Sequence, residues 1–311
     1  MKELHTNEAS DVVAIIGLGQ MGAAFGMSLR RAGFVTFGFD IDEDRARLFE
    51  RDGGSLLRSA GGLPDDCELV ITSLPAPEAL ETVIGGEDGL ASSGRTGVIV
   101  MEASTLPIAT KESARRQLAA AGSAMLDCPV SGTAAQARVG DLTVFVSGDQ
   151  ATAEACGAVF EALGRSWRYL GEFGRGMKMK FVANLLIAVH NMAAAEALVL
   201  GVKAGLDAQL VYEVISDSAA TSRMFEVSGP IMLSEDYEDA SAKVQILHKD
   251  LQLIRAFATQ AGAPTPLMSL TAEFYTSAMA LGMEAFEDAS VHLLLARLAG
   301  LERDFSMPPQ G

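Results

Sequence analysis

The chain is short of positive charge, and this shortage excludes two classes of partner. Its 311 residues contain 24 Lys and Arg against 40 Asp and Glu, which gives a formal net charge of −16. A surface of this charge repels nucleic acids and anionic membranes, so we expect neither as a partner. A small anionic substrate remains possible if its site supplies local positive charge.

Cysteine and histidine are too few and too scattered for a disulfide scaffold or a metal centre. Cys67, Cys128 and Cys156 are an odd number at irregular spacing, which is typical of a reduced cytoplasmic protein. The four histidines show no metal-ligand pairing, so we expect no metal. Residues 1–10 are polar and mixed in charge, which favours a disordered lead-in over a signal peptide.

Apolar residues, by contrast, are plentiful. They make up 49% of the sequence, enough for a full core, and the length of the chain suggests two domains. Residues 177–200 contain no Gly or Pro and are dense in Ala, Leu and Met. They predict a helix of about 25 residues, roughly 37 Å long. Because this run is apolar almost all round, we expect the helix to be buried.

Polar residues within this run argue against a membrane span, which is the rival interpretation. They are Lys178, Lys180, Asn184, His190, Asn191 and Glu196. At about 100° per residue, Lys180, Asn184 and Asn191 share one stripe of the helix. Burying a lysine without a partner is costly. Either Lys180 extends its ammonium group into water, or the stripe faces a cleft in which Lys180 transfers a proton.

The first half of the chain opens with a strand, a glycine-rich turn, a helix and a second strand closed by an acid. Val12–Ile16 is an apolar run of β type, and the turn Gly17-Leu18-Gly19-Gln20-Met21-Gly22 follows it. A helical stretch then reaches about Arg31, and residues 34–39 form a strand that Asp40 closes. The GxGxxG pattern thus has a strand before it, a helix after it and an acid 18 residues after its third glycine, as a dinucleotide-binding motif requires.

Each part of this pattern has a role in binding a dinucleotide. Gly17 permits the tight turn, Gly19 lets the backbone approach a pyrophosphate, and Gly22 lets helix and strand pack closely. The Asp40 carboxylate accepts hydrogen bonds from ribose hydroxyls and would repel a 2′-phosphate by a few kcal/mol at an effective dielectric of about 20. Positions 41 and 42 are Ile and Asp, with no Arg to receive that phosphate. We therefore predict NAD as the cofactor, in preference to NADP.

Strands and helices continue to alternate, which predicts an α/β Rossmann domain with a doubly wound, mostly parallel sheet. We expect strands over 68–74, 97–101, 124–127, 142–148 and 166–170, and helices over 43–51, 111–121 and 151–163. Ligands of such sheets lie beyond the carboxyl ends of the strands. Leu74-Pro75 and Ser104-Thr105 follow two strand ends, so they are expected beside the cofactor. The alternative is that they are ordinary loop residues.

Residues 127–133 also follow a strand end. Small residues there expose backbone N–H groups and the Ser131 hydroxyl to an anion. Turn chemistry alone explains the Ser131-Gly132 pair about equally well.

The second half of the chain is expected to be all helical. Helices are predicted over 208–216, 242–260, 265–281 and 289–301, and the tail 305–311 is expected to be loose. We place a Rossmann domain at 11–173 and an all-α domain at 174–311. Lys249 is the second lysine of interest, although an exposed charge pair with Asp250 is the simpler interpretation.

Four blocks of sequence, taken in order, resemble one family. They are Gly17–Gly22, Asp127–Gly132, Gly174–Asn184 and Lys249–Leu251. Together they resemble the β-hydroxyacid dehydrogenase family, which includes 3-hydroxyisobutyrate dehydrogenase and tartronate semialdehyde reductase. The resemblance extends from about residue 12 to about residue 295. It implies a Rossmann domain joined by a long helix to a helical domain, through which family members form dimers or tetramers.

The resemblance also implies residue roles. Lys180 would be the general acid/base, and Asn184 would hold the substrate hydroxyl or carboxylate. Ser131 and Gly132 would belong to the loop that binds the substrate carboxylate, and Lys249 would close over the nicotinamide end. The implied reaction is hydride transfer between a small hydroxy acid and NAD.

Two positions depart from the family pattern. The family loop usually reads Ser-Gly-Gly, and Thr133 stands in place of its last glycine. Ala183 stands at a position where the family often has Asn. A threonine hydroxyl at this loop favours a polar, hydroxylated substrate. Residues 222–226, with His190 and residues 274–280, look most like the L-threonate dehydrogenase branch. Arg223 is a candidate partner for the substrate carboxylate.

Three alternatives stay open beside this interpretation. The same site runs in either direction, so the reaction can be the reduction of a semialdehyde. A non-catalytic NAD-binding member is a second alternative, but such members lose the lysine, and Lys180 and Asn184 are both present. Imine reductases have the same architecture, but they carry Asp or Tyr where Lys180 stands and usually prefer NADP.

Overall fold

The chain forms two compact units in a computed structural model, which describes residues 11–238 and 240–301. The first unit ends at Lys180 and the second, the helical unit, begins at Phe181. This division falls inside the long helix α8 (Arg175–Lys203). The expected lead-in at 1–10 and the tail at 305–311 lie outside the described residues.

A six-stranded parallel sheet with the order β3-β2-β1-β4-β5-β6 organises the first unit. Its strands are β1 (Val12–Ile16), β2 (Val35–Phe39), β3 (Ser55–Leu56), β4 (Leu69–Thr72), β5 (Ile99–Glu102) and β6 (Ala124–Asp127). The order along the chain reverses between β1 and β4, which is the switch point where such sheets bind dinucleotides. The predicted doubly wound parallel sheet is confirmed.

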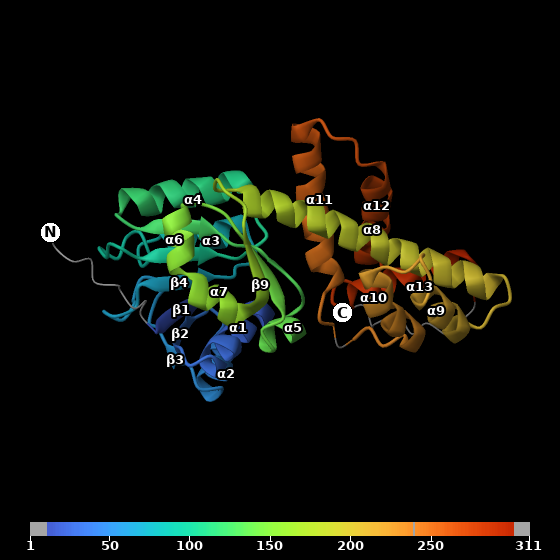
Figure 1. Cartoon of the computed structure of the whole chain (residues 1–311), viewed down its shortest axis with the longest axis horizontal. Helices are drawn as coiled ribbons and strands as arrows, with labels where there is room; N and C mark the ends of the chain where they lie inside the picture. The colour runs from blue at the N-terminus through green and yellow to red at the C-terminus, as the bar shows by residue number, and fades with distance from the viewer. Residues whose placement is uncertain (1–10, 239, 302–311) are drawn as a thin grey trace. The chain divides into compact units, whose positions relative to one another are not determined.

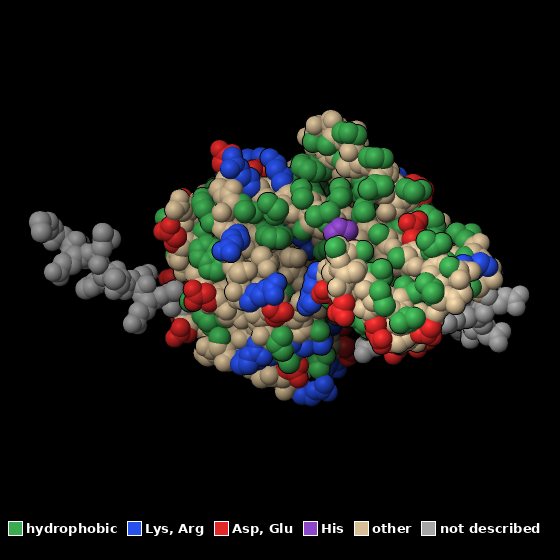
Figure 2. All heavy atoms as spheres, turned by 45° about the vertical axis from the view of Figure 1, so that its right-hand side comes forward, with side chains coloured by type: hydrophobic (Ala, Val, Ile, Leu, Met, Phe, Trp, Pro, Cys, Tyr) green, Lys and Arg blue, Asp and Glu red, His purple; other side chains and the backbone are tan. Residues whose placement is uncertain are grey.

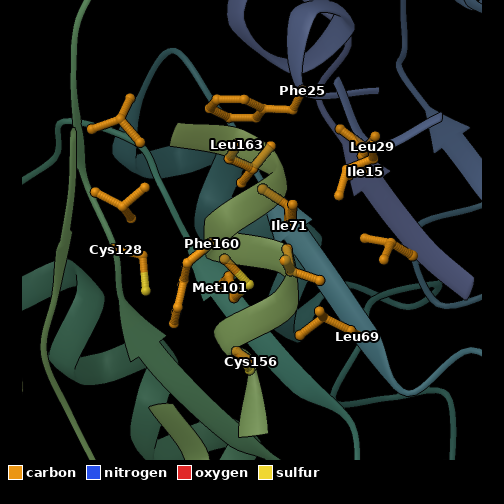
Figure 3. Packing of buried hydrophobic residues seen from close by; sticks show 14 of the residues in the cluster. Ile15, Phe25, Leu29, Leu69, Ile71, Met101, Cys128, Cys156, Phe160 and Leu163 are labelled. Atoms are coloured by element: carbon orange, nitrogen blue, oxygen red, sulfur yellow. The ribbon is translucent and has the colours of Figure 1, made fainter. Parts of the chain in front are cut away.

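Helices cover both faces of this sheet (Figure 1). They are α1 (Gln20–Arg31), α2 (Glu43–Arg51), α3 (Pro77–Gly85) and α4 (Ile108–Ala120). Successive residues of a strand point to opposite faces. Ile15 therefore packs in one core with Phe25 and Phe160 (Figure 3), whereas Ala14 packs in the other with Leu80. Both faces of the sheet are buried, which explains the continuous apolar runs of its strands.

A smaller sheet follows, with the order β7-β8-β9. Its strands are β7 (Val130–Ser131), β8 (Leu142–Val146) and β9 (Gly164–Tyr169), and the helices between them are α5 (Ala134–Arg138), α6 (Gln150–Ala155) and α7 (Gly157–Leu163). β7 runs antiparallel to β8, whereas β9 runs parallel to it. The single helix predicted over 151–163 is interrupted at Cys156, where α6 ends and α7 begins.

Every described element that lies wholly within the helical unit is a helix. They are α9 (Ala208–Ser216), α10 (Arg223–Ser234), α11 (Val244–Ala261), α12 (Pro266–Ala280), the short 3₁₀ helix η1 (Asp288–Ser290) and α13 (Val291–Leu298). The predicted all-α domain is confirmed. Helix α10 was not predicted, and it contains Pro230.

The expectation that α8 is buried all round is wrong. It is the one helix among the described residues that is long and apolar enough to cross a membrane, yet its most apolar window is only 44% buried. Its apolar residues Val182 and Leu186 are 53% and 48% exposed, whereas the polar Asn184 and Asn191 are 5% and 0% exposed. The helical period predicted correctly that Asn184 and Asn191 share one face of α8. Their hydrogen bonds to Asp250 and Tyr275 place that face inside.

A buried polar cluster holds Asn191 in the helical unit. Its Nδ2 donates to the Tyr275 hydroxyl at 3.0 Å and to Asp288 Oδ1 at 3.1 Å. The Tyr275 hydroxyl donates in turn to the Asp288 backbone oxygen at 3.1 Å. Burial first, and then the charge of Glu287, raises the pKa of Asp288 to about 8, although the Asn191 hydrogen bond acts in the opposite direction.

This raised pKa makes stability depend on pH. The folded-state pKa of Asp288, about 8, lies above the ordinary value of 3.8, so between these values only the folded protein keeps the proton. Stability therefore falls as the pH rises from about 4 to about 8, by up to about 1.4 kcal/mol per pH unit. Asp288→Asn keeps an acceptor for Asn191 and removes the titration. We expect it to raise the Tm at pH 8 and to flatten the pH dependence.

Thermal unfolding across this pH range checks the prediction, with Asp236→Asn on the exposed surface as the control. An Asp288→Asn variant whose Tm follows the same pH dependence as the wild type would contradict it.

Candidate active site

The glycine-rich turn lies between β1 and α1, and its three glycines have different reasons to be there. Gly17 has a φ of +92°, and an added Cβ would clash with the Ser73 carbonyl oxygen. A Cβ on Gly22 would clash with the Gly17 carbonyl oxygen. A Cβ on Gly19, however, would meet no described atom within 4 Å. The fold requires Gly17 and Gly22, whereas Gly19 leaves open the space that a bound pyrophosphate needs.

The start of α1 suits an anion. No side chain caps this helix, and its first turn, beginning at Gln20 and Met21, contains no acidic residue. The partial positive charge at the N-terminus of α1 is therefore not offset by a carboxylate from its own first turn. Together with the open side of Gly19, this arrangement fits the pyrophosphate of a dinucleotide.

Asp40 braces this turn. Its Oδ2 accepts a hydrogen bond from the Leu18 N–H at 2.7 Å, and its Oδ1 accepts one from the Asp42 N–H at 2.9 Å. The predicted cofactor acid thus lies directly against the predicted turn. The sequence reasoning missed Arg45, whose guanidinium lies 3.9 Å from Asp40 Oδ2 and 3.2 Å from Asp42. Arg45 lies in the first turn of α2, three residues beyond position 42, so considering positions 41 and 42 alone could not reveal it.

The two predicted strand-end loops are joined to each other. Ser104 Oγ accepts a hydrogen bond from the Leu74 N–H at 2.8 Å. Ser104 is buried, Thr105 is half-buried and Pro75 is exposed. The loops after β4 and β5 therefore form one connected edge beyond the carboxyl ends of the strands.

The predicted substrate loop continues from β7 into α5. Gly132 has a φ of +134°, and a Cβ there would lie 2.6 Å from Leu142 Cδ2. Thr133 is the N-cap of α5, where its Oγ1 accepts from the Gln136 N–H at 3.3 Å and its own N–H donates to Gln136 Oε1 at 3.0 Å. The threonine that departs from the family pattern thus has a structural role as a helix cap.

Lys180 and Asn184 lie one turn apart on the same face of α8. Lys180 is half-buried, and Asn184 Nδ2 donates to Asp250 Oδ2 at 2.7 Å. Asp250 is 3% exposed, and its Oδ1 lies 3.0 Å from Lys249 Nζ. Asp250 therefore joins two residues that were predicted separately, Asn184 and Lys249.

Sequence reasoning treated Asp250 only as a surface partner of Lys249. A signal was available, because Leu247, Leu251 and Ile254 mark the buried face of α11 and position 250 falls on that face. A carboxylate at such a position needs a partner. Arg223, the other candidate, is an exposed residue paired with Glu226 at 3.1 Å.

The sequence matches two family models in succession. Residues 12–171 match the NAD-binding domain of 6-phosphogluconate dehydrogenase. Residues 174–295 match the NAD-binding domain of NADP-dependent 3-hydroxyisobutyrate dehydrogenase.

Characterised relatives match nearly the whole chain. It is 35% identical over 280 residues to L-threonate dehydrogenase of Cupriavidus necator, covering 90% of this chain and 94% of that protein. It is also 35% identical over 305 residues to NAD-dependent L-serine dehydrogenase of Pseudomonas aeruginosa, covering 95% of each. The crystal structure of 3-hydroxyisobutyrate dehydrogenase from Salmonella typhimurium superposes with a TM-score of 0.82 at 30% identity, covering 91% of this chain and 99% of that one.

The fold, its glycine-rich turn and these matches together define a nicotinamide-dependent dehydrogenase. The chain belongs to the β-hydroxyacid dehydrogenase family and is an NAD(P)-dependent hydroxyacid dehydrogenase.

The different demands on Gly19 and Gly22 give a matched pair of variants. We expect Gly19→Ala to keep the wild-type Tm and to weaken NADH binding about tenfold or more, because its Cβ meets only the space needed by the pyrophosphate. Gly22→Ala should destabilise the fold by about 1–3 kcal/mol through its clash with Gly17. Thermal unfolding and fluorescence titration with NADH measure the two effects. If Gly19→Ala binds NADH as tightly as the wild type does, the pyrophosphate does not bind beside Gly19.

Proposed function

We propose that the protein is an NAD-preferring dehydrogenase of a small, polar hydroxy acid, with L-threonate as the favoured substrate and Lys180 as the general acid/base. One observation carries the proposal: Lys180 lies one turn from Asn184, whose amide is fixed by the buried Asp250. The similarity to L-threonate dehydrogenase supports the choice of substrate.

The residues of the chain have complementary tasks in this reaction. The bound nicotinamide supplies the hydride acceptor. Lys180 takes the proton of the substrate hydroxyl as the hydride leaves, and it returns that proton in the reverse direction. Donation of one Nδ2 hydrogen to Asp250 fixes the orientation of the Asn184 amide, which then holds the substrate hydroxyl or carboxylate. Ser131 and Gly132 offer their hydroxyl and backbone N–H groups to the carboxylate.

Charge supports an anionic substrate at these residues. The chain as a whole carries a net charge of −16, so an anion needs local cations to approach. Lys180 and Lys249 supply them, and Lys249 closes over the nicotinamide end in the proposed arrangement. The ion pair with Asp250 holds Lys249 at the same cluster that orients Asn184.

Asp40 supports NAD over NADP. Its carboxylate is held against the glycine turn by Leu18, so a 2′-phosphate placed there would meet a fixed negative charge. Arg45 offsets part of this repulsion from 3.9 Å. The L-serine dehydrogenase relative is NAD-dependent by name, although one matched family model is described as NADP-dependent.

Oxidation of L-serine is a second candidate function. The L-serine dehydrogenase relative matches over 95% of this chain at the same 35% identity as the L-threonate enzyme. Both substrates carry a carboxylate and a hydroxyl, and serine adds an ammonium group. Reduction of a semialdehyde is the reverse use of the same site.

The decisive experiment compares initial rates of NADH formation with L-threonate, L-serine and 3-hydroxyisobutyrate, in NAD and in NADP. The proposal expects the highest kcat/KM for L-threonate with NAD. A preference for 3-hydroxyisobutyrate would show that Thr133 is only a helix cap, and a preference for NADP would overturn the role of Asp40. If all three acids fail while NADH still binds, semialdehyde reduction and the non-catalytic alternative are the ones to test.

Lys180 and Lys178 form a matched pair for testing the base. We expect Lys180→Ala to lower kcat by about 10²–10⁴-fold while the Kd for NADH stays unchanged, because the lysine acts on the substrate proton. Lys178 is exposed and lies on the opposite face of α8, so Lys178→Ala should retain wild-type turnover. Steady-state kinetics and NADH titration measure both. Turnover retained in Lys180→Ala would exclude this lysine as the base.

We also infer that a second copy of the chain covers the exposed face of α8. Met179, Val182, Leu186 and Leu200 are 41–71% exposed, and at about 100° per residue they form one stripe opposite Lys180. Figure 2 shows hydrophobic side chains over the visible face of the helical unit. Contiguous apolar surface of this kind marks an interface, and most soluble oligomers are built from identical chains.

A charged substitution within this stripe tests the inference. We expect the wild type to be a dimer or tetramer by light scattering after size exclusion, and the double variant Val182→Glu with Leu186→Glu to be smaller, because burying two carboxylates at the interface is costly. Val139→Glu, on an exposed residue of the first unit, is the control. A monomeric wild type would refute the inference.

A further inference from the structure

Three charged side chains lie fully buried in the first unit. Glu102 closes β5 and Asp127 closes β6, and the two are partners in the parallel register, so their carboxylates lie side by side. Lys111, from the first turn of α4, lies between them, with its Nζ 2.6 Å from Glu102 Oε2 and 2.8 Å from Asp127 Oδ1. All three side chains are 0% exposed. We call these residues the buried triad.

Stability alone does not explain the buried triad. Burial by itself would lower the pKa of Lys111, but the charges of Asp127 and Glu102, with their hydrogen bonds, outweigh it and raise that pKa. Lys111 is therefore an ammonium group between two carboxylates. Well-packed apolar side chains in place of a buried ion pair are often as stable or more stable. The carboxylate oxygens that do not contact Lys111 point to another role for the buried triad, because they accept hydrogen bonds from neighbouring segments.

One arm of the buried triad leads to the cofactor-side loops. Glu102 Oε1 accepts a hydrogen bond from the Ser104 N–H at 3.0 Å. Ser104 Oγ accepts from the Leu74 N–H at 2.8 Å. Glu102 therefore holds the loops after β4 and β5, where the cofactor is expected.

The other arm leads to the first turn of α8. Asp127 Oδ2 accepts from the Met177 N–H at 2.8 Å and from the Ser147 hydroxyl at 3.1 Å, and Ser147 Oγ accepts from the Gly176 N–H at 2.9 Å. These N–H groups belong to the first turn, where a helix cannot satisfy them itself. A Cβ on Gly176 would lie 2.8 Å from the Asp127 backbone oxygen, so the helix begins in close contact with the sheet. Lys180 lies one turn further along α8, on the same face as Gly176.

We propose that the buried triad is a positioning device that sets Lys180 in register with the loops at Leu74 and Ser104. The proposal rests on the proposed function of Lys180. Lys111 joins the two arms, so the cofactor-side loops and the start of α8 take their position from one charged centre. Lys111, Glu102 and Asp127 are positioning residues and act on the reaction only through the groups that they hold.

Amide hydrogen exchange of the protein without ligands tests the two arms directly. In Lys111→Met we expect faster exchange both at Leu74 and at Gly176-Met177. In Ser147→Ala we expect it only at Gly176-Met177. The control is Ser28→Ala, which also removes a buried serine hydroxyl, one that donates to the Ala137 carbonyl in another part of the unit. It should leave both peptides unchanged.

Kinetics test the effect on Lys180. We expect kcat to fall about 100-fold in Lys111→Met, because small misplacements of a catalytic group are this costly, with KM within about twofold of the wild type. Loss of one hydrogen bond in Ser147→Ala should lower kcat about fivefold, and Ser28→Ala should keep it.

Two outcomes would overturn the proposal. One is a folded Lys111→Met with wild-type exchange at both segments and kcat within about twofold of the wild type. The other is equal loss of kcat in Ser147→Ala and Ser28→Ala, which also decides the matter if Lys111→Met does not fold. The exchange measurement needs no substrate, so its result stands even if Lys180→Ala shows that the proposed base is wrong.

Discussion

The Asp127 carboxylate holds the start of the long helix α8. One oxygen accepts from the Met177 N–H at the start of α8, and the other pairs with Lys111. The parallel register of β5 and β6 makes Glu102 its neighbour. Two buried carboxylates side by side need a cation, and α4 supplies it from its first turn. Sheet register, a buried lysine and the origin of α8 are thus linked by one set of contacts.

Helix α8 is organised with its polar stripe inside and an apolar stripe outside. Inside, Asn184 Nδ2 donates to Asp250 and Asn191 Nδ2 donates to Tyr275, so the NH2 groups of these buried amides have partners. Outside, Val182 and Leu186 are exposed. The helix therefore combines three properties along its length: a start held by Asp127, a polar face that carries Lys180, and an exposed apolar face.

The sequence predicted the parts of the fold that local patterns determine. The strand, turn and acid around Gly17–Asp40 are local, and so is the alternation that produced the parallel sheet. The short β7 and α5 escaped notice because two and five residues are too few to show a period. Lys111 and Asp250 escaped because their partners come from other elements. Only the tertiary structure shows that Lys111, on an apparently ordinary helix, is fully buried between two acids.

Thr133 shows how a structural role and a functional one can share a side chain. Its hydroxyl oxygen accepts from the Gln136 N–H, which fixes the oxygen but leaves the O–H hydrogen to be donated elsewhere. A glycine at this position would lose the cap, so the departure from the family loop is explained without reference to substrate. The same cap, however, holds a hydroxyl at a set place beside Ser131 and Gly132. In the proposed function, this hydroxyl can donate its hydrogen to a substrate that carries an additional polar group.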